Sequence, residues 1–276
     1  MQIAIVTDST ADIPPTLAAQ YEICVIPAII VIEGNSLQDG VDISRQTFYH
    51  QLPAMRSHPT TATPSPEQFS QVYKKLFQRG AQAILSIHIA SELSGIFSSA
   101  SLAAQGFGDR VHVIDSRTLS MGVGYQVLAA AQAATKNYSL EKIIATIQNI
   151  CQRIRVIAML DSLTYIHRSG RVSWTKARIG SLLNIKPFIE IKNGQVINLS
   201  NTRSRQRGIA KIIKIVTAWG PLEHIAILHS NAENDAKQLR LDITSMQPIA
   251  PMIVDITPTI GVHVGPNGLG IAAVLR

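Results

Sequence analysis

The feature that most constrains the fold of this chain is a regular alternation of short apolar segments with amphipathic segments over roughly its first half. Four apolar segments have the length and β-branched content of buried strands: 3–6, 25–32, 83–89 and 111–114. The segments between and after them predict helices at 16–21, 44–52, 66–79, 98–105, 122–134 and 140–154. Strands separated by helices are typical of a parallel sheet, so we predict an N-terminal α/β domain at residues 1–158.

The second half follows another pattern, in which Asn193-Gly194 separates two short apolar runs. That dipeptide is the strongest short-range signal for a β-hairpin. Strands are predicted at 155–160, 188–192, 195–199, 224–229, 249–256 and 269–275, and helices at 163–167, 177–183, 207–219 and 235–241. We therefore expect a C-terminal α+β domain at residues 159–276 with a mixed sheet. Because no Pro/Gly/Ser-rich linker marks the boundary, we expect the two domains to pack closely and to share a site in the crevice between them.

Composition indicates a globular protein, with 46% hydrophobic and 16% charged residues. No apolar run reaches the roughly 18 residues that a membrane helix needs. The chain begins with a strand-like segment rather than a basic region, so we expect no signal peptide. Cys24 and Cys151 are far apart and form no CxxC motif, which favours a reducing, cytoplasmic setting.

The positive charge is concentrated in the second half. Residues 1–150 carry nine Lys/Arg and eleven Asp/Glu, whereas residues 151–276 carry sixteen and seven. Such asymmetry predicts contact with something acidic, namely nucleic acid, an anionic membrane surface, a phosphorylated ligand or an acidic protein. A solvated basic face without a partner is the alternative.

Ligands of open α/β sheets bind beyond the carboxyl ends of the strands, which selects the polar loops 7–12, 91–95 and 115–124. Ser94 lies in the second of these loops, before a predicted helix. It is either a plain N-cap or part of an anion site with Gly95 at the helix N-terminus. Thr61 and Thr63 are predicted to lie on a rigid loop before the helix that Ser65 caps, and read alone they are ordinary loop threonines.

The last twenty residues place four glycines and two prolines around His263. Because glycine permits unusual backbone and proline fixes φ, we expect a loop of defined shape that aims the imidazole. A turn with an incidental histidine is the alternative. Arg171 follows a glycine turn near the domain boundary and suits bidentate contact with a carboxylate or phosphate. Arg203 begins a basic run that is otherwise a solvated helix face.

Several reaction classes find no motif here. The sequence has no GxxxxGK[ST] phosphate loop, no close match to the dinucleotide fingerprint and no HExxH or clustered Cys/His spacing. Recognisable nucleic-acid modules are missing, and only 5% of residues are aromatic, so a nucleic-acid regulator is the least supported hypothesis. A triad of Ser94, His263 and an aspartate remains open, because triad order varies among hydrolases. An independent serine esterase or phosphotransferase is therefore the alternative to a binding protein.

Taken together, these segments resemble the DegV family of bacterial fatty-acid-binding proteins over nearly the whole chain. The resemblance rests on the following segments: Thr7 to Pro14, Thr61 with Pro64-Ser65, Leu93-Ser94-Gly95, Asp115-Ser116 with Ser120-Met121-Gly122, Gly170 to Ser173, Leu183 to Pro187 and Gly261 to Pro266. Departures occur at Ala62 and Thr63, where the family often has Ser-Gln, and at Ser169, where it often has Gly.

The resemblance implies two α/β domains enclosing one long-chain fatty acid, with no cofactor. It implies that Thr61, Ser94 and His263 hold the carboxylate, and that Thr63, Gly95, Arg171 and Arg203 contribute head-group or partner contacts. Similar proteins are subunits of a fatty acid kinase and present the carboxylate to an ATP-binding partner, which makes an acyl phosphate for phospholipid synthesis. The resemblance thus implies a kinase partner, transient membrane contact and no nucleic acid. His263 would then lie beside the transferred phosphoryl group.

Overall fold

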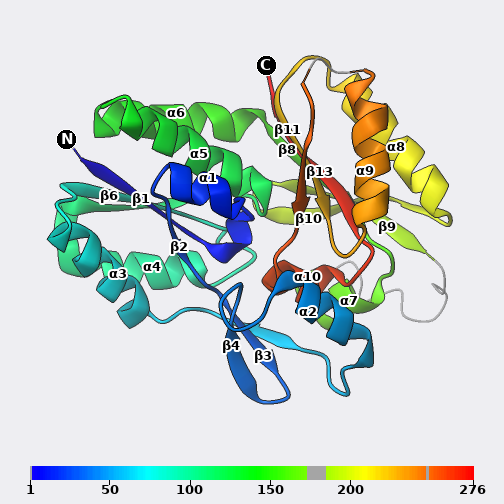
Figure 1. Cartoon of the computed structure of the whole chain (residues 1–276), viewed down its shortest axis with the longest axis horizontal. Coiled ribbons are helices and arrows are strands. Elements are labelled where there is room, and N and C mark those ends of the chain that lie inside the picture. The colour runs from blue at the N-terminus through cyan, green and yellow to red at the C-terminus, as the bar shows by residue number, and fades with distance from the viewer. Residues whose placement is uncertain (1, 173–184, 247–248) are drawn as a thin grey trace.

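The computed structural model describes residues 2–172, 185–246 and 249–276 (Figure 1). The N-terminal half contains a parallel four-stranded sheet in the order β2-β1-β6-β7. Its strands are β1 (Ile3–Asp8), β2 (Cys24–Ile26), β6 (Ala83–His88) and β7 (Val111–Asp115). The predicted α/β organisation of this half is therefore confirmed, and β6 is buried along its whole length, as its apolar sequence indicates.

Helices cover both faces of this sheet, as Figure 1 shows. One face carries α3 (Pro66–Gln78) and α4 (Ile96–Ala104), and the other carries α5 (Met121–Thr135) and α6 (Leu140–Arg153), with α1 (Pro15–Gln20) beside them. Ser65 caps α3 as predicted: its hydroxyl accepts a hydrogen bond from Gln68 N–H, and the Gln68 side chain accepts one from Ser65 N–H.

A small antiparallel sheet in the order β4-β3-β5 was not predicted. It contains β3 (Ile29–Ile32), β4 (Asn35–Gln38) and β5 (Thr60–Ala62). The expectation of one strand over 25–32 is wrong, because the chain leaves the first sheet at Pro27 and enters the small sheet at Ile29. Proline lacks the N–H that a continuous ladder requires. Thr61 therefore lies on a strand, paired with Ile30, and not on the predicted loop.

The C-terminal half contains a mixed six-stranded sheet in the order β10-β9-β8-β13-β11-β12. These strands are β8 (Ile154–Met159), β9 (Lys186–Lys192), β10 (Gln195–Thr202), β11 (Leu222–His229), β12 (Met252–Asp255) and β13 (Leu269–Leu275). Strands β9 and β10 form the predicted hairpin, with positive φ angles at Asn193 (50°) and Gly194 (79°). The helix predicted at 177–183 lies outside the described residues.

One face of this sheet is covered by α8 (Arg205–Ala218) and α9 (Glu233–Thr244), and the other packs on the N-terminal half. A single apolar cluster joins Val123 and Ile147 of the N-terminal helices to Val156 and Ala272 of the six-stranded sheet. The close packing expected from the missing linker is present, while the division at residue 158 stays a prediction. Within the described ranges, no helix is both long and apolar enough to cross a membrane.

The segment around His263 forms a helix, α10 (Pro258–Val264), and not the expected loop. Pro258 occupies its first turn, which suits proline because that N–H has no partner within the helix. Gly261 allows close packing on α2 (Arg45–Gln51), since a Cβ there would lie 2.6 Å from the Tyr49 hydroxyl oxygen. Helix α7 (Thr164–Arg168) lies beside the other end, so α10 is enclosed between the two halves (Figure 1).

Candidate functional site

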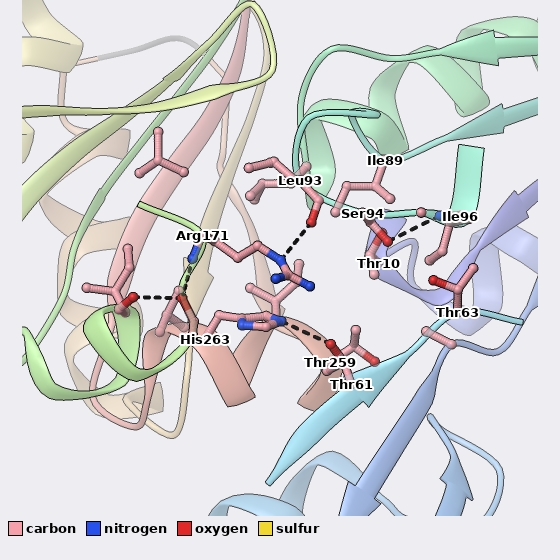
Figure 2. Close-up of a pocket in the computed structure, with 18 of the residues that line it drawn as sticks. Thr10, Thr61, Thr63, Ile89, Leu93, Ser94, Ile96, Arg171, Thr259 and His263 are labelled. Carbon is pink, nitrogen blue, oxygen red and sulfur yellow. Dashed lines mark hydrogen bonds between the residues drawn. The ribbon is translucent and has the colours of Figure 1, made fainter. Parts of the chain in front are cut away.

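A cavity lies between the carboxyl-end loops of the four-stranded sheet, strand β5, helix α10 and the β9–β10 hairpin. It holds about 800 Å³ of empty space, open solvent at its entrance included. Six of the seven candidate residues line it: Thr61, Thr63, Ser94, Gly95, Arg171 and His263. Figure 2 shows Thr61, Thr63, Ser94, Arg171 and His263 around one space.

His263 is the most informative of these residues. It lies in the last turn of α10, and its Nε2 is 3.3 Å from the Thr61 hydroxyl on β5. Burial, followed by the charges of Arg171 and His58, lowers the pKa of His263 to about 4. The ring is therefore neutral at neutral pH, with one nitrogen that donates and one that accepts. Among the described residues, no group hydrogen-bonds to its Nδ1, although that atom is buried.

Ser94 lies across the cavity from α10 (Figure 2). Its Oγ accepts a hydrogen bond from Ile96 N–H at 3.3 Å, while Gly95 occupies the N-cap position of α4. The prediction that Ser94 is the N-cap is thus displaced by one residue, but its hydroxyl still satisfies a helix-terminal N–H. Gly95 has a separate role, because a Cβ there would lie 3.1 Å from Oγ1 of Thr63. The missing side chain lets the Thr63 hydroxyl approach the start of α4.

Arg171 adds positive charge to this end of the cavity. Its Nε donates to the carbonyl oxygen of Leu93 at 3.2 Å, so the guanidinium is held against the loop that carries Ser94. The structure does not bring Arg203 to the same place. That residue is exposed ahead of α8 and is not among those that line the cavity.

Two further threonines line the cavity and were missed from the sequence. Thr10 lies in the loop 7–12 that the carboxyl-end rule selected, and its hydroxyl donates to Asp8. Thr259 lies in the first turn of α10, and its hydroxyl donates to Asp39 at 2.5 Å. The carboxyl-end rule, which selects the loop 7–12, could have identified Thr10. No sequence signal identifies Thr259, because the sequence predicts a loop where the structure has the first turn of α10.

A second cavity of about 490 Å³ adjoins the first. The residues that line both are Leu119, Ile189, Ile191, Ile260 and Val264. From this shared wall the second cavity extends along the inner face of the six-stranded sheet, past Val156 and Leu228. Most of its lining residues are aliphatic, and the polar ones are Ser120, His229 and Ser230. The arrangement therefore offers a polar end near His263 that is followed by a long apolar space.

The contacts of Ser94 and His263 do not form a hydrolytic triad. Ser94 accepts from Ile96 N–H, while the hydrogen-bonding neighbour of His263 is Thr61. A nucleophilic serine requires a base within hydrogen-bond reach, and that base requires an orienting third group. Over the residues that the structure describes, no carboxylate pairs with His263. The geometry thus suits binding of an anionic group better than acyl transfer. No group of three or more Cys, His, Asp or Glu in the described ranges is arranged to hold a metal ion.

Comparison with known proteins agrees with this architecture. A family model described as "Uncharacterised protein, DegV family COG1307" matches residues 2–276. A DegV domain-containing protein of Caldanaerobacter subterraneus subsp. tengcongensis is 34% identical over 275 residues, 98% of each chain. A solved structure described as fatty acid binding of a DegV family protein from Thermus thermophilus superimposes with a TM-score of 0.92 at 31% identity, covering both chains completely. The structure of DegV from Bacillus subtilis, described as a fatty acid binding protein, gives 0.89 at 29% identity, again with full coverage. This chain therefore belongs to the DegV family.

Proposed function

We propose that this protein binds one long-chain fatty acid, with the carboxylate at Thr61, Ser94 and His263 and the acyl chain in the two adjoining cavities. The observation that carries the proposal is the continuity of an aliphatic space with a cluster of hydroxyls and a neutral imidazole. The Thermus and Bacillus relatives, which are described as binding fatty acids, support the same ligand class.

The apolar space supplies most of the affinity. Each buried CH₂ contributes roughly 0.8 kcal/mol, so a long acyl chain contributes on the order of 10 kcal/mol before ordering costs. The head group contributes orientation, because a carboxylate that leaves water needs hydrogen-bond donors. Thr61 and Ser94 have hydroxyl hydrogens to donate, and Arg171 adds charge at the same end.

We propose that Thr63 and Gly95 shape the head-group site and that the bound carboxylate is presented to an ATP-dependent kinase partner. A carrier role accounts for the absence of a phosphate-loop motif from the sequence. Arg171, the exposed Arg203 and the basic second half provide charge for an acidic partner or an anionic membrane surface. His263 would lie beside the phosphoryl group during transfer.

Organic extraction of freshly purified protein, followed by mass spectrometry, tests ligand binding directly. We expect about one fatty acid per chain, and delipidated protein should take up added fatty acid. Thr61→Val and Ser94→Ala should each weaken uptake about tenfold, the value of a hydrogen bond to a charged group. Ser101→Ala is the matched control, because Ser101 lies on α4, its hydroxyl donates within that helix to Phe97 O, and it does not line the cavity. Protein that is empty and rejects fatty acid would overturn the proposal.

A further inference from the structure

Helix α10 is capped by carboxylates from distant parts of the chain. Its N-cap residue, Thr257, makes no side-chain capping bond to its own helix. Two aspartates accept instead from this turn: Asp12 follows β1, and Asp39 follows β4. They precede α10 by more than 200 residues, so the contacts join the first motif of the sequence to the last one.

Asp12 is completely buried and uses both oxygens. Its Oδ1 accepts from Thr257 N–H at 2.7 Å and is 3.5 Å from the Arg45 guanidinium, while its Oδ2 accepts from the Ser120 hydroxyl at 2.5 Å. Asp12 itself adopts a left-handed backbone with φ of 54°. Such a conformation is unusual for a residue with a side chain, although aspartate tolerates it better than most. The carboxylate thus links the loop after β1, helix α5 and the start of α10.

Asp39 binds the same turn from the other side. Its Oδ2 accepts from the hydroxyls of Ser9, Thr257 and Thr259 and lies 3.4 Å from Thr259 N. Negative charge at a helix N-terminus is also favoured by the helix dipole. Only 3% of Asp39 is exposed, so these hydrogen bonds have little competition from water.

Helix α10 borders the cavity from its first turn to its last. The helix has seven residues and therefore spans about 10 Å at 1.5 Å per residue. Thr259, Ile260, His263 and Val264 all line the cavity, so a small tilt at the N-terminus displaces these four residues together. We propose that Asp12 and Asp39 are positioning residues, which hold the start of α10 and thereby fix where Thr259 and His263 face the ligand head group. The part of this inference that concerns ligand binding rests on the proposed function, whereas the part that concerns the placement of His263 is independent of it.

The charged groups around Asp12 make its hydrogen bonding to the start of α10 sensitive to pH. Arg45 and Tyr49 face it from α2, and Asp39 faces it from the small sheet. Arg45 also donates to the backbone carbonyl oxygen of Asp255 at the end of β12. Burial raises the pKa of Asp12 to about 7, against the opposing effects of Arg45, Ser120 and Thr257. A proton on Asp12 would remove the negative charge that faces Arg45 and the N-terminus of α10, and so would weaken the hold of Asp12 on this helix.

Asp12→Asn and Asp39→Asn test the proposal, because the amide keeps the side-chain shape and replaces one acceptor oxygen by a donor. We expect the Kd for a fluorescent long-chain fatty acid to rise about tenfold in each, the effect of one hydrogen bond to a charged group. We also expect the imidazole ¹⁵N signals of His263 in ligand-free protein to shift, with assignment from His263→Gln. In Asp12→Asn the pH dependence of these signals between 6 and 8 should disappear. Asp109→Asn removes an exposed carboxylate and is the control.

Thr257→Val tests the positioning role if either aspartate variant fails to fold. It removes one donor to Asp39, and Thr257 does not line the ligand cavity. A smaller shift in the same direction is expected. A Kd within twofold of wild type with unchanged His263 signals, in folded variants, would overturn the inference. Wild-type protein that binds no fatty acid would overturn the proposed function instead, and the ligand-free His263 signals would still test the positioning role.

Discussion

Two histidines in this protein share a chemistry but differ in their hydrogen-bond partners. His88, on β6, is completely buried, and both of its ring nitrogens are occupied: Nδ1 lies 2.9 Å from Asp8 and Nε2 lies 2.7 Å from the Ser86 hydroxyl. Tyr73 in turn donates to Ser86 at 2.8 Å. His263 has the Thr61 hydroxyl at 3.3 Å from Nε2, and across the described part of the chain its Nδ1 has no partner.

The difference shows that triad geometry is a poor guide to function in this fold. Ser86, His88 and Asp8 have the connectivity of a hydrolytic triad. Yet Ser86 is completely buried, and neither it nor His88 lines the ligand cavity. In this network Tyr73 donates to Ser86, Ser86 donates to His88 and His88 donates to Asp8, so each donor has an acceptor. A satisfied buried network gives rigidity, whereas His263 lines the cavity with a hydrogen-bonding capacity that the described residues do not fill.

The largest effect that this comparison predicts is on stability. His88→Ala should lower the free energy of unfolding by about 3 to 5 kcal/mol, because it removes one hydrogen-bond partner from each of Asp8 and Ser86 and creates a cavity beside Phe69. Chemical denaturation measures this, with His50→Ala on the exposed side of α2 as the control. A loss below about 1 kcal/mol would remove the structural role assigned to the relay.

The layout of elements was predictable because it depends on local pattern. The alternation of buried and amphipathic segments identified the parallel sheet, and Asn193-Gly194 identified the hairpin. Prediction failed where long-range contacts override local composition. The glycines around His263 indicated a loop, yet Asp12 and Asp39 cap the segment as a helix from across the molecule. No local signal in α10 could have revealed those partners.

The polar residues of the candidate site were predicted from the sequence, whereas its apolar wall was not. Thr61, Ser94, Arg171 and His263 were candidates from local patterns, to which the resemblance to a family added their roles, and the structure brings them to one cavity. Their roles in binding stay predictions. The apolar wall was invisible from sequence, because Ile189 and Ile260 have the composition of any core residue. Arg203 was selected from a basic run and lies away from the cavity, because it connects β10 to α8 on the other face of the six-stranded sheet.

The second largest effect is expected at His263, where a substitution should change fatty-acid affinity much more than the free energy of unfolding. His263→Ala should change the free energy of unfolding by less than about 1 kcal/mol, because the side chain lines a cavity and, in the described ranges, has one long hydrogen bond, to Thr61. The same change should weaken fatty-acid binding about tenfold if the ring contacts the carboxylate. Thermal denaturation and fluorescent-ligand displacement measure the two quantities. Binding equal to wild type would contradict a head-group contact and would leave His263 as a wall of the cavity.

The smallest expected effect is a fraction of a proton taken up on binding. In the ligand-free protein the pKa of His263 is about 4, below the 6.5 of an unperturbed imidazole, because burial and Arg171 disfavour the charged ring. A carboxylate placed beside the ring acts in the opposite direction and raises that pKa. Binding between pH 5 and 6.5 should therefore take up protons, and the affinity should rise as the pH falls through this range.

Calorimetry in two buffers with different ionisation enthalpies measures that uptake. The fatty acid also titrates weakly in this range, so the informative quantity is the difference between wild type and His263→Gln, which keeps a polar side chain without a titrating ring. Equal uptake by the two proteins would show that the carboxylate is not beside His263. The hydrogen bond between His88 and Asp8 lies away from the cavity and should not contribute to proton uptake on binding. The difference in uptake between wild type and His263→Gln should therefore persist in variants that leave α10 in place. It should shrink in Asp12→Asn, where the start of α10 has lost an acceptor, and that result would connect the two ends of the helix in one measurement.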